Sequence, residues 1–163
     1  MLGVVAAATV VAGGWSLKRG AAAAARPLAP IAWLAGGQWR PASNETGIAR
    51  RFEWSEGGLF LRERRADPGG DPAGEVLYYR HHGEDEIALH GVLREGHVEG
   101  LLRAMPGGAL ELQTRQWSLD GEILLWRERV VPQGPHRLAW TRWRLTESGE
   151  VLDREEILVR SRR

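Results

Sequence analysis

The sequence predicts an all-β protein: a single antiparallel, up-and-down barrel of nine or ten strands behind an N-terminal apolar leader. From residue 48 onward apolar and polar residues alternate with a period of two, which is typical of half-buried strands. Short turns rich in Gly, Pro and Asp separate these segments, and no segment has the length and periodicity of a helix. Consecutive hairpins form a meander, and a twisted sheet of this size closes into a barrel, which removes exposed edges. A β-sandwich is the alternative, but it requires longer crossing connections.

The length of 163 residues fits one domain, preceded by a segment of different composition. Residues 1–25 hold an apolar run of small residues and end in alanines at 23–25, the pattern of a signal peptide and its cleavage site. The sequence therefore predicts an exported, periplasmic protein whose barrel domain is 26–163. The alternatives are an uncleaved membrane anchor and a tail on a cytoplasmic protein.

Residues 27–40, PLAPIAWLAGGQWR, are predicted to form a plug and the first strand. Trp33 and Trp39 stand on either side of the pair Gly36-Gly37. The remaining strands are expected at 48–54, 59–65, 75–81, 87–93, 98–104, 110–117, 123–131, 137–145 and 151–160. Loops rich in Pro and Gly, such as 67–72, and hairpin signals such as Asp120-Gly121 separate them.

The expected turns also predict the strand register. A two-residue turn at Glu95-Gly96 places Leu89 opposite Leu102 and Gly91 opposite Gly100. The predicted interior row is Leu89, Leu102 and Leu112. The row beside it consists of the small residues Gly91, Gly100 and Thr114. Small inward residues leave room for a ligand, the alternative being that the glycines relieve a bend in the wall.

Composition excludes several chemistries. Without cysteine there are no disulfides, thiolate nucleophiles or cysteine-based metal sites. Lys18 is the only lysine, so the barrel domain has none for a Schiff base or a phosphate loop. A net charge of +1 gives no bulk attraction to nucleic acid or to an anionic membrane. No nucleic-acid partner is expected, and membrane contact only through an uncleaved leader.

No metal site and no cofactor are predicted. His81 and His82, together with the acidic residues 84–86 and His90, offer imidazole and carboxylate ligands. His81 and His82, however, point to opposite faces of a strand, and His90 is expected on the face away from Leu89. The preferred interpretation is a solvated polar turn.

The strand tryptophans that are candidates for a pocket are Trp54, Trp126 and Trp140. Trp140 and Trp143 differ in parity, so at most one of them faces the interior. Arg127 and Arg142 are the charged candidates, because an inward arginine would favour a carboxylate or phosphate on the ligand. The alternative is that these arginines form cross-strand ion pairs on the outer face.

The two ends of the chain carry a family resemblance. Gly37-Gln38-Trp39 is a Gly-x-Trp at the first strand, and Arg160 lies near the end of the last. This pattern resembles the lipocalin (calycin) barrels, and the wider run from Trp33 to Trp39 is similar to bacterial lipocalin-like families of unknown function. The resemblance implies that Trp39 closes one end of the barrel with Arg160 packed across it.

The function expected from these observations is non-enzymatic binding of a small, mostly apolar or amphipathic ligand inside the barrel. The candidate ligand-binding residues are Trp54, Leu89, Gly91, Gly100, Leu102, Leu112, Thr114, Trp126, Arg127, Trp140 and Arg142. One alternative is an enzyme on the same barrel that uses an inward Arg with a Glu or His; Glu63 and Glu128 are an example of a possible acid–base pair, although no catalytic motif is present. Another alternative is a structural or interaction module with a filled core.

Overall fold

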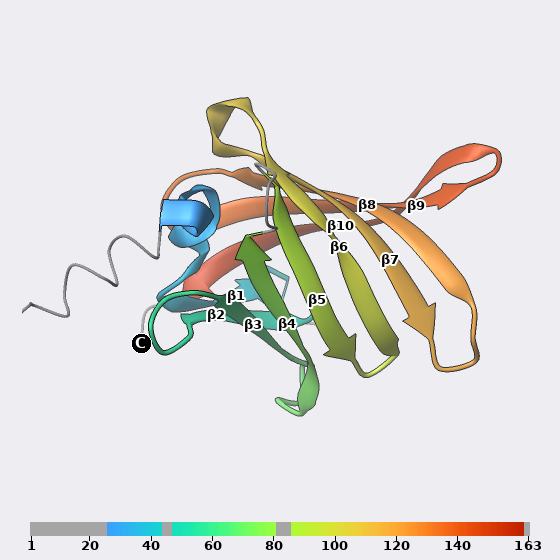
Figure 1. Ribbon diagram of the computed structural model, residues 1–163, viewed down its shortest axis with the longest axis horizontal. Coiled ribbons are helices and arrows are strands. Elements are labelled where there is room, and N and C mark those ends of the chain that lie inside the picture. The colour runs from blue at the N-terminus through green and yellow to red at the C-terminus, as the bar shows by residue number, and fades with distance from the viewer. Residues whose placement is uncertain (1–25, 44–46, 81–85, 162–163) are drawn as a thin grey trace, which may run out of the picture.

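A computed structural model describes residues 26–43, 47–80 and 86–161 of the chain. The strands run β1 Gly37–Pro41, β2 Ala49–Trp54, β3 Leu61–Ala66, β4 Pro72–Arg80, β5 Ile87–Leu93, β6 Gly96–Ala104, β7 Leu110–Ser118, β8 Ile123–Pro132, β9 Arg137–Thr146 and β10 Gly149–Ser161. Within the described residues these ten strands pair antiparallel with their sequence neighbours, and β1 pairs with β10 to close the barrel (Figure 1). The predicted all-β, up-and-down barrel is confirmed.

One end of the barrel is covered by the 3-10 helix η1, Arg26–Leu34, which leads directly into β1 (Figure 1). Leu28, Ile31 and Leu34 of η1 are buried among the inward side chains at this end of the strands. The Trp39 indole N–H donates to the Leu34 carbonyl over 2.9 Å, which ties the first strand to the plug. The segment predicted to form a plug and a first strand therefore has that structure.

Short turns form the opposite, open end, which includes the β3–β4, β5–β6, β7–β8 and β9–β10 connections. The β9–β10 hairpin extends beyond the rest of this end (Figure 1). Its β10 strand has a bulge at Asp153, the residue left unpaired between Leu152 and Arg154. A bulge of this kind lets a strand redirect one side chain.

The register between β5 and β6 corrects the sequence prediction. The turn lies at Arg94 and Glu95, one residue earlier than expected, so Leu93 pairs with Gly96. Leu89 is therefore opposite Gly100 instead of Leu102, and Gly91 is opposite Val98 instead of Gly100. Because the error is two residues, every side chain keeps its predicted face. The β6–β7 register, which pairs Leu102 with Leu112 and Gly100 with Thr114, is as predicted.

Gly96 explains why the turn shifts. Its φ is +139°, a region that other residues rarely adopt, and an added Cβ would lie 1.9 Å from the Trp117 carbonyl oxygen. Gly96 is thus needed within β6, where β7 passes close by, and is not free to occupy the turn.

Gly91 and Gly100 mark close approaches between strands, not empty space. A Cβ on Gly100 would lie 2.2 Å from the Gln113 carbonyl oxygen, and one on Gly91 would lie 2.5 Å from the Glu75 carbonyl oxygen. The volume beside each glycine is occupied by neighbouring backbone. The structure therefore favours the alternative in which glycines accommodate a bend in the wall.

Some predictions fall outside the described residues, namely the leader at 1–25 and the turn that holds His81 and His82. None of the helices in the described ranges is long and apolar enough to cross a lipid bilayer.

Candidate ligand site inside the barrel

The interior of the barrel is apolar near η1 and polar toward the open end. Charged side chains occupy inward positions of β2, β3, β8 and β9. In a run such as 62–65 every residue is charged, so the alternation of faces along the strand turns some of these charges inward. Charged residues on inward positions in this part of the barrel include Arg50, Glu63, Arg65, Glu128 and Arg142, and on β10 also Glu156 and Arg154. Buried charges are costly unless they are paired, so their partners decide what this interior can do.

Glu63 is the centre of the first buried network. Its side chain is 0% exposed and accepts hydrogen bonds from Arg50 Nη1 and Arg65 Nε at 2.7 Å each. The Tyr78 hydroxyl donates to the other carboxylate oxygen over 2.6 Å. Glu63 therefore has three donors drawn from three different strands, two of them buried and one, Arg65, partly buried.

These contacts determine the charge of Glu63. Burial alone would raise the pKa of Glu63, but the positive charges of Arg65 and Arg50 and the hydrogen bonds from Arg65 and Tyr78 outweigh burial and lower the pKa to about 2. Burial and the Glu63 charge raise the pKa of Tyr78 well above its ordinary value. Glu63 is thus ionised at neutral pH and cannot supply the proton in an acid–base pair with Glu128.

Glu128 is at the centre of a second set of contacts. The Trp140 indole N–H donates to the Glu128 carboxylate over 2.7 Å. The guanidinium carbon of Arg50 lies 4.0 Å from the centroid of the Trp140 ring, so one cation contacts both networks. Arg50 therefore connects the contacts of Glu63 with those of Glu128.

Beside these contacts lies a small recess with about 20 Å³ of open space. Its lining residues are Arg65, Tyr78, Leu89, Leu93, Val98, Leu112, Thr114, Gln116, Trp126, Glu128 and Arg142. Thr114 and Trp126 are each 7% exposed and are paired directly across β7 and β8. Neither the Thr114 hydroxyl nor the Trp126 indole N–H has a hydrogen-bond partner within the described residues. A space of this size holds about one water molecule.

Arg142 covers part of the recess. Its guanidinium carbon lies 4.2 Å from the centroid of the Trp126 ring. Its Nε and Nη2 atoms lie 2.7 and 2.6 Å from the carboxylate of Asp153, the bulge residue of β10. The Arg142 side chain is 29% exposed, so this lid is in contact with solvent.

The structure brings several predicted site residues together around the recess: Leu89, Leu112, Thr114, Trp126 and Arg142. Trp140 is buried and donates a hydrogen bond to Glu128, which lines the recess. Leu102 belongs to the apolar core, and Trp54 is half-buried against that core. As the parity rule predicted, Trp143 does not share the face of Trp140.

Arg127 corrects the prediction that it faces the interior. It lies on the outer surface, where its guanidinium carbon is 4.4 Å from the centroid of the Trp143 ring. It pairs there with Glu150 at 2.5 Å and with Glu111 at 3.5 Å. Arg127 is one residue from the inward positions Trp126 and Glu128, and a strand alternates its faces at every residue.

Sequence reasoning missed Arg50, Arg65, Tyr78 and Gln116 as interior residues. The signal was present: Tyr78 and the apolar Val76 have the same parity on β4, as do Arg65 and the buried Leu61 on β3. A buried charge contradicts the expectation that inward positions are apolar, and only the cross-strand partners make it favourable.

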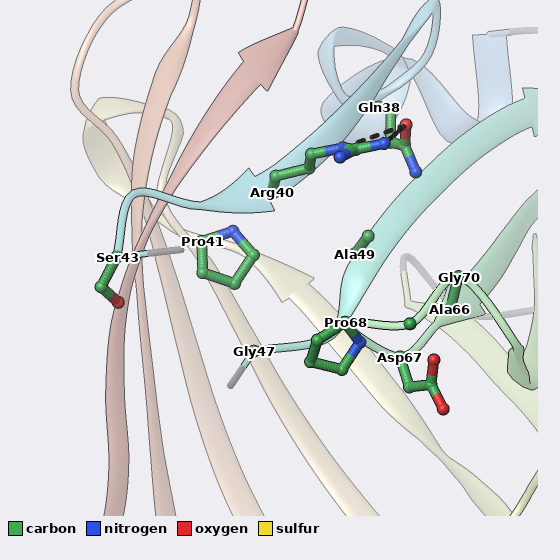
Figure 2. A pocket seen from close by; sticks show the side chains of 11 residues that line it. Gln38, Arg40, Pro41, Ser43, Gly47, Ala49, Ala66, Asp67, Pro68 and Gly70 are labelled. Atoms are coloured by element: carbon green, nitrogen blue, oxygen red, sulfur yellow. Dashed lines mark hydrogen bonds between the residues drawn. The ribbon is translucent and has the colours of Figure 1, made fainter. Parts of the chain in front are cut away.

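A larger hollow of about 280 Å³ lies near the open end, between the end of β1, the start of β2 and the β3–β4 turn (Figure 2). Its polar groups already have partners: Arg40 donates to Gln38 across the groove wall, and Asp67 accepts from Arg94 (Figure 2 shows the Arg40–Gln38 contact). The size of this groove exceeds that of the recess, but the recess is lined by two buried polar groups without partners in the described residues, Thr114 and Trp126, which are directly paired across two strands. We therefore assign the candidate site to the interior.

The chain matches no family model, no curated protein and no solved structure. The closed barrel of ten strands, counted over the described residues, is compatible with a lipocalin-like fold.

Proposed function

We propose that this protein binds a small amphipathic molecule in the recess at the polar end of the barrel interior. The observation that carries the proposal is the pair Thr114 and Trp126, two buried polar groups side by side without partners. A buried donor left unsatisfied costs about 1–3 kcal/mol. A ligand that accepts from the indole N–H and bonds the hydroxyl would remove that cost.

The recess lining indicates the chemistry of this ligand. The Trp126 indole N–H is only a donor, so the ligand should present an acceptor. Arg65 is already paired with Glu63, and Glu128 also lines the recess, so the cation available to a ligand is Arg142 once it leaves Asp153; its best partner would be a carboxylate or sulfonate. Leu89 and Leu112 offer apolar contact on another side. The ligand should therefore join a planar or apolar body to one anionic group, in place of the mostly apolar molecule expected from the sequence.

Entry of a ligand larger than water requires Arg142 to leave the Trp126 ring. The Arg142–Asp153 pair is partly exposed, and exposed ion pairs contribute only about 0.2–1 kcal/mol. A planar ligand body would then take the place of the guanidinium over the indole face. Movement of one partly exposed side chain would thus open the site without disturbing Glu63.

The wider setting is proposed on sequence features alone. The apolar segment at 1–25 supports export to the periplasm, and the Gly-x-Trp at 37–39 with Arg160 supports a lipocalin-like carrier. A carrier of this class would hold its ligand without transforming it.

The direct test has two parts. Native mass spectrometry of the full chain, purified gently, would detect a bound mass that leaves on denaturation. Titration with 8-anilinonaphthalene-1-sulfonate, a planar anionic dye, would measure occupancy by fluorescence. We expect Trp126→Phe and Thr114→Val to weaken dye binding by about tenfold, the loss of one hydrogen bond to a charged group.

Arg127→Ala is the matched control, because it removes an arginine that lies over a tryptophan on the outer surface. It should leave dye binding unchanged. Equal binding by wild type, Trp126→Phe and Thr114→Val would rule out the recess as the site. A bare protein mass together with no dye binding would favour a filled-core structural module.

A further inference from the structure

Three side chains with metal-binding groups meet on the outer surface of β5 and β6. His90 of β5 is paired directly with Glu99 of β6, and His97 lies two residues before Glu99 on the same face. The imidazole rings of His90 and His97 have centroids 4.9 Å apart. The candidate ligand atoms of all three residues lie within 4.8 Å of one another.

We propose that His90, His97 and Glu99 bind one divalent transition-metal ion of the Zn²⁺ class. Two imidazoles and one carboxylate are a donor set that zinc accepts, with the remaining positions held by water. Imidazole nitrogens disfavour Mg²⁺ and Ca²⁺, which take oxygen ligands. This site lies on the outside of the barrel and is independent of the interior recess.

The distances allow such an ion after a small adjustment. Ligand atoms about 2.0–2.1 Å from a tetrahedral zinc are about 3.3 Å apart, so the side chains must close by rotation. His90 and Glu99 are exposed, so the side chains that must move are in contact with solvent. Among the parts of the chain that the structure describes, Glu99 forms no ion pair that metal binding would have to break.

His97 is held in place by its neighbour on β7. Its ring stacks on Trp117 with centroids 4.6 Å apart and an interplanar angle of 13°. A stacked ring loses less conformational entropy when it binds a metal. Arg115, directly opposite Glu99, adds a positive charge nearby, and its guanidinium carbon is 5.6 Å from the centroid of the Trp117 ring. This charge weakens the site but leaves its ligands unblocked.

The test is calorimetric titration of the full chain with Zn²⁺, after a polyhistidine tag and bound metals have been removed. We expect one equivalent of Zn²⁺ per chain and no detectable binding of Mg²⁺. Cu²⁺ should bind more tightly than Zn²⁺, as the general order of divalent ions requires. His90→Ala and His97→Ala should each weaken Zn²⁺ binding at least about tenfold, and Glu99→Gln should weaken it in the same direction.

Two controls separate this site from other histidines. His136→Ala changes the histidine that precedes β9 in the sequence, and the double variant H81A/H82A changes the pair that follows β4 in the sequence. Both should bind Zn²⁺ like the wild type, with unchanged far-ultraviolet circular dichroism. The proposal is overturned if the wild type binds no Zn²⁺, if H90A and H97A bind like the wild type, or if H81A/H82A abolishes binding.

Discussion

Arg160 of β10 lies over the indole ring of Trp39, its direct partner on β1, with the guanidinium carbon 4.4 Å from the ring centroid. Arg160 also donates a hydrogen bond to the Trp33 carbonyl. Two residues that are 121 positions apart in the chain therefore join the first strand, the last strand and the plug at the point where the barrel closes.

Removal of the Trp39 ring should be among the most destabilising changes in this barrel. Trp39 is completely buried, and truncation of a buried tryptophan to alanine costs about 3–5 kcal/mol. We expect Trp39→Ala to lower the free energy of unfolding in urea by this amount. Trp143→Ala, on the outer surface, should cost less than half as much. Equal losses would show that Trp39 has no special role in closure.

Stability should depend on pH through Glu63. The pKa of Glu63 in the folded barrel is about 2, below its ordinary value of 4.5. A folded-state pKa that is depressed stabilises the protein fully above the unfolded pKa, and that contribution is lost as the pH falls from 4.5 toward 2. A shift of this size corresponds to roughly 3 kcal/mol. Urea unfolding at a series of pH values measures this loss.

Glu63→Gln is the variant that isolates this effect. This variant leaves Arg50 and Arg65 in the barrel without their counter-charge. The free energy of unfolding at neutral pH should therefore fall by about 3–5 kcal/mol. It should also flatten the pH dependence in the acidic range. Asp67→Asn is the comparison: the hydrogen bonds from Arg94 and from the Asp71 N–H also lower the pKa of Asp67, but this carboxylate is in contact with solvent, so its removal should change the acidic pH dependence less than Glu63→Gln does. A pH profile of Glu63→Gln identical to that of the wild type would contradict the assigned pKa.

Gly100 should not tolerate a side chain. An alanine Cβ there would lie 2.2 Å from the Gln113 carbonyl oxygen, and relief requires β6 and β7 to separate. We expect Gly100→Ala to destabilise the barrel by about 1–3 kcal/mol, as overpacking does. Gly69→Ala, in the β3–β4 turn with only the Asp67 side chain nearby, should have little effect. A stable Gly100→Ala protein would mean that open space exists beside this residue.

Two tryptophan-to-phenylalanine changes should destabilise the protein by different amounts. Both remove part of a buried ring, but the Trp126 N–H has no partner in the described residues, so Trp126→Phe loses only ring contacts. The Trp140 N–H donates to Glu128, so Trp140→Phe should cost about 1–3 kcal/mol more than Trp126→Phe. Thermal unfolding of the two variants compares them directly. Equal losses in the two variants would contradict the assignment of a hydrogen-bond partner to the Trp140 N–H and none to the Trp126 N–H.

Much of the fold could be predicted because strands and turns depend on neighbours in the chain. The alternation at 87–93 and the turn residues after it identified a strand of the correct bounds, and parity placed Trp140 and Trp143 on different faces. The two-residue error in the β5–β6 register arose because Gly96 is required by Trp117, a residue of another strand. Nothing within the hairpin itself reveals that contact.

The candidate site was less predictable for the same reason. Thr114, Trp126 and Arg142 were identified from their residue types and faces, whereas the partners that define the site come from distant strands. Local sequence by itself determined the strands, the plug and the alternation of faces, since these depend on backbone sterics and on residues within a few positions. Only the tertiary structure decided that Glu63 is compensated by Arg50, Arg65 and Tyr78 while Thr114 and Trp126 are left without partners, because the energy of a buried polar group depends on what faces it across the barrel.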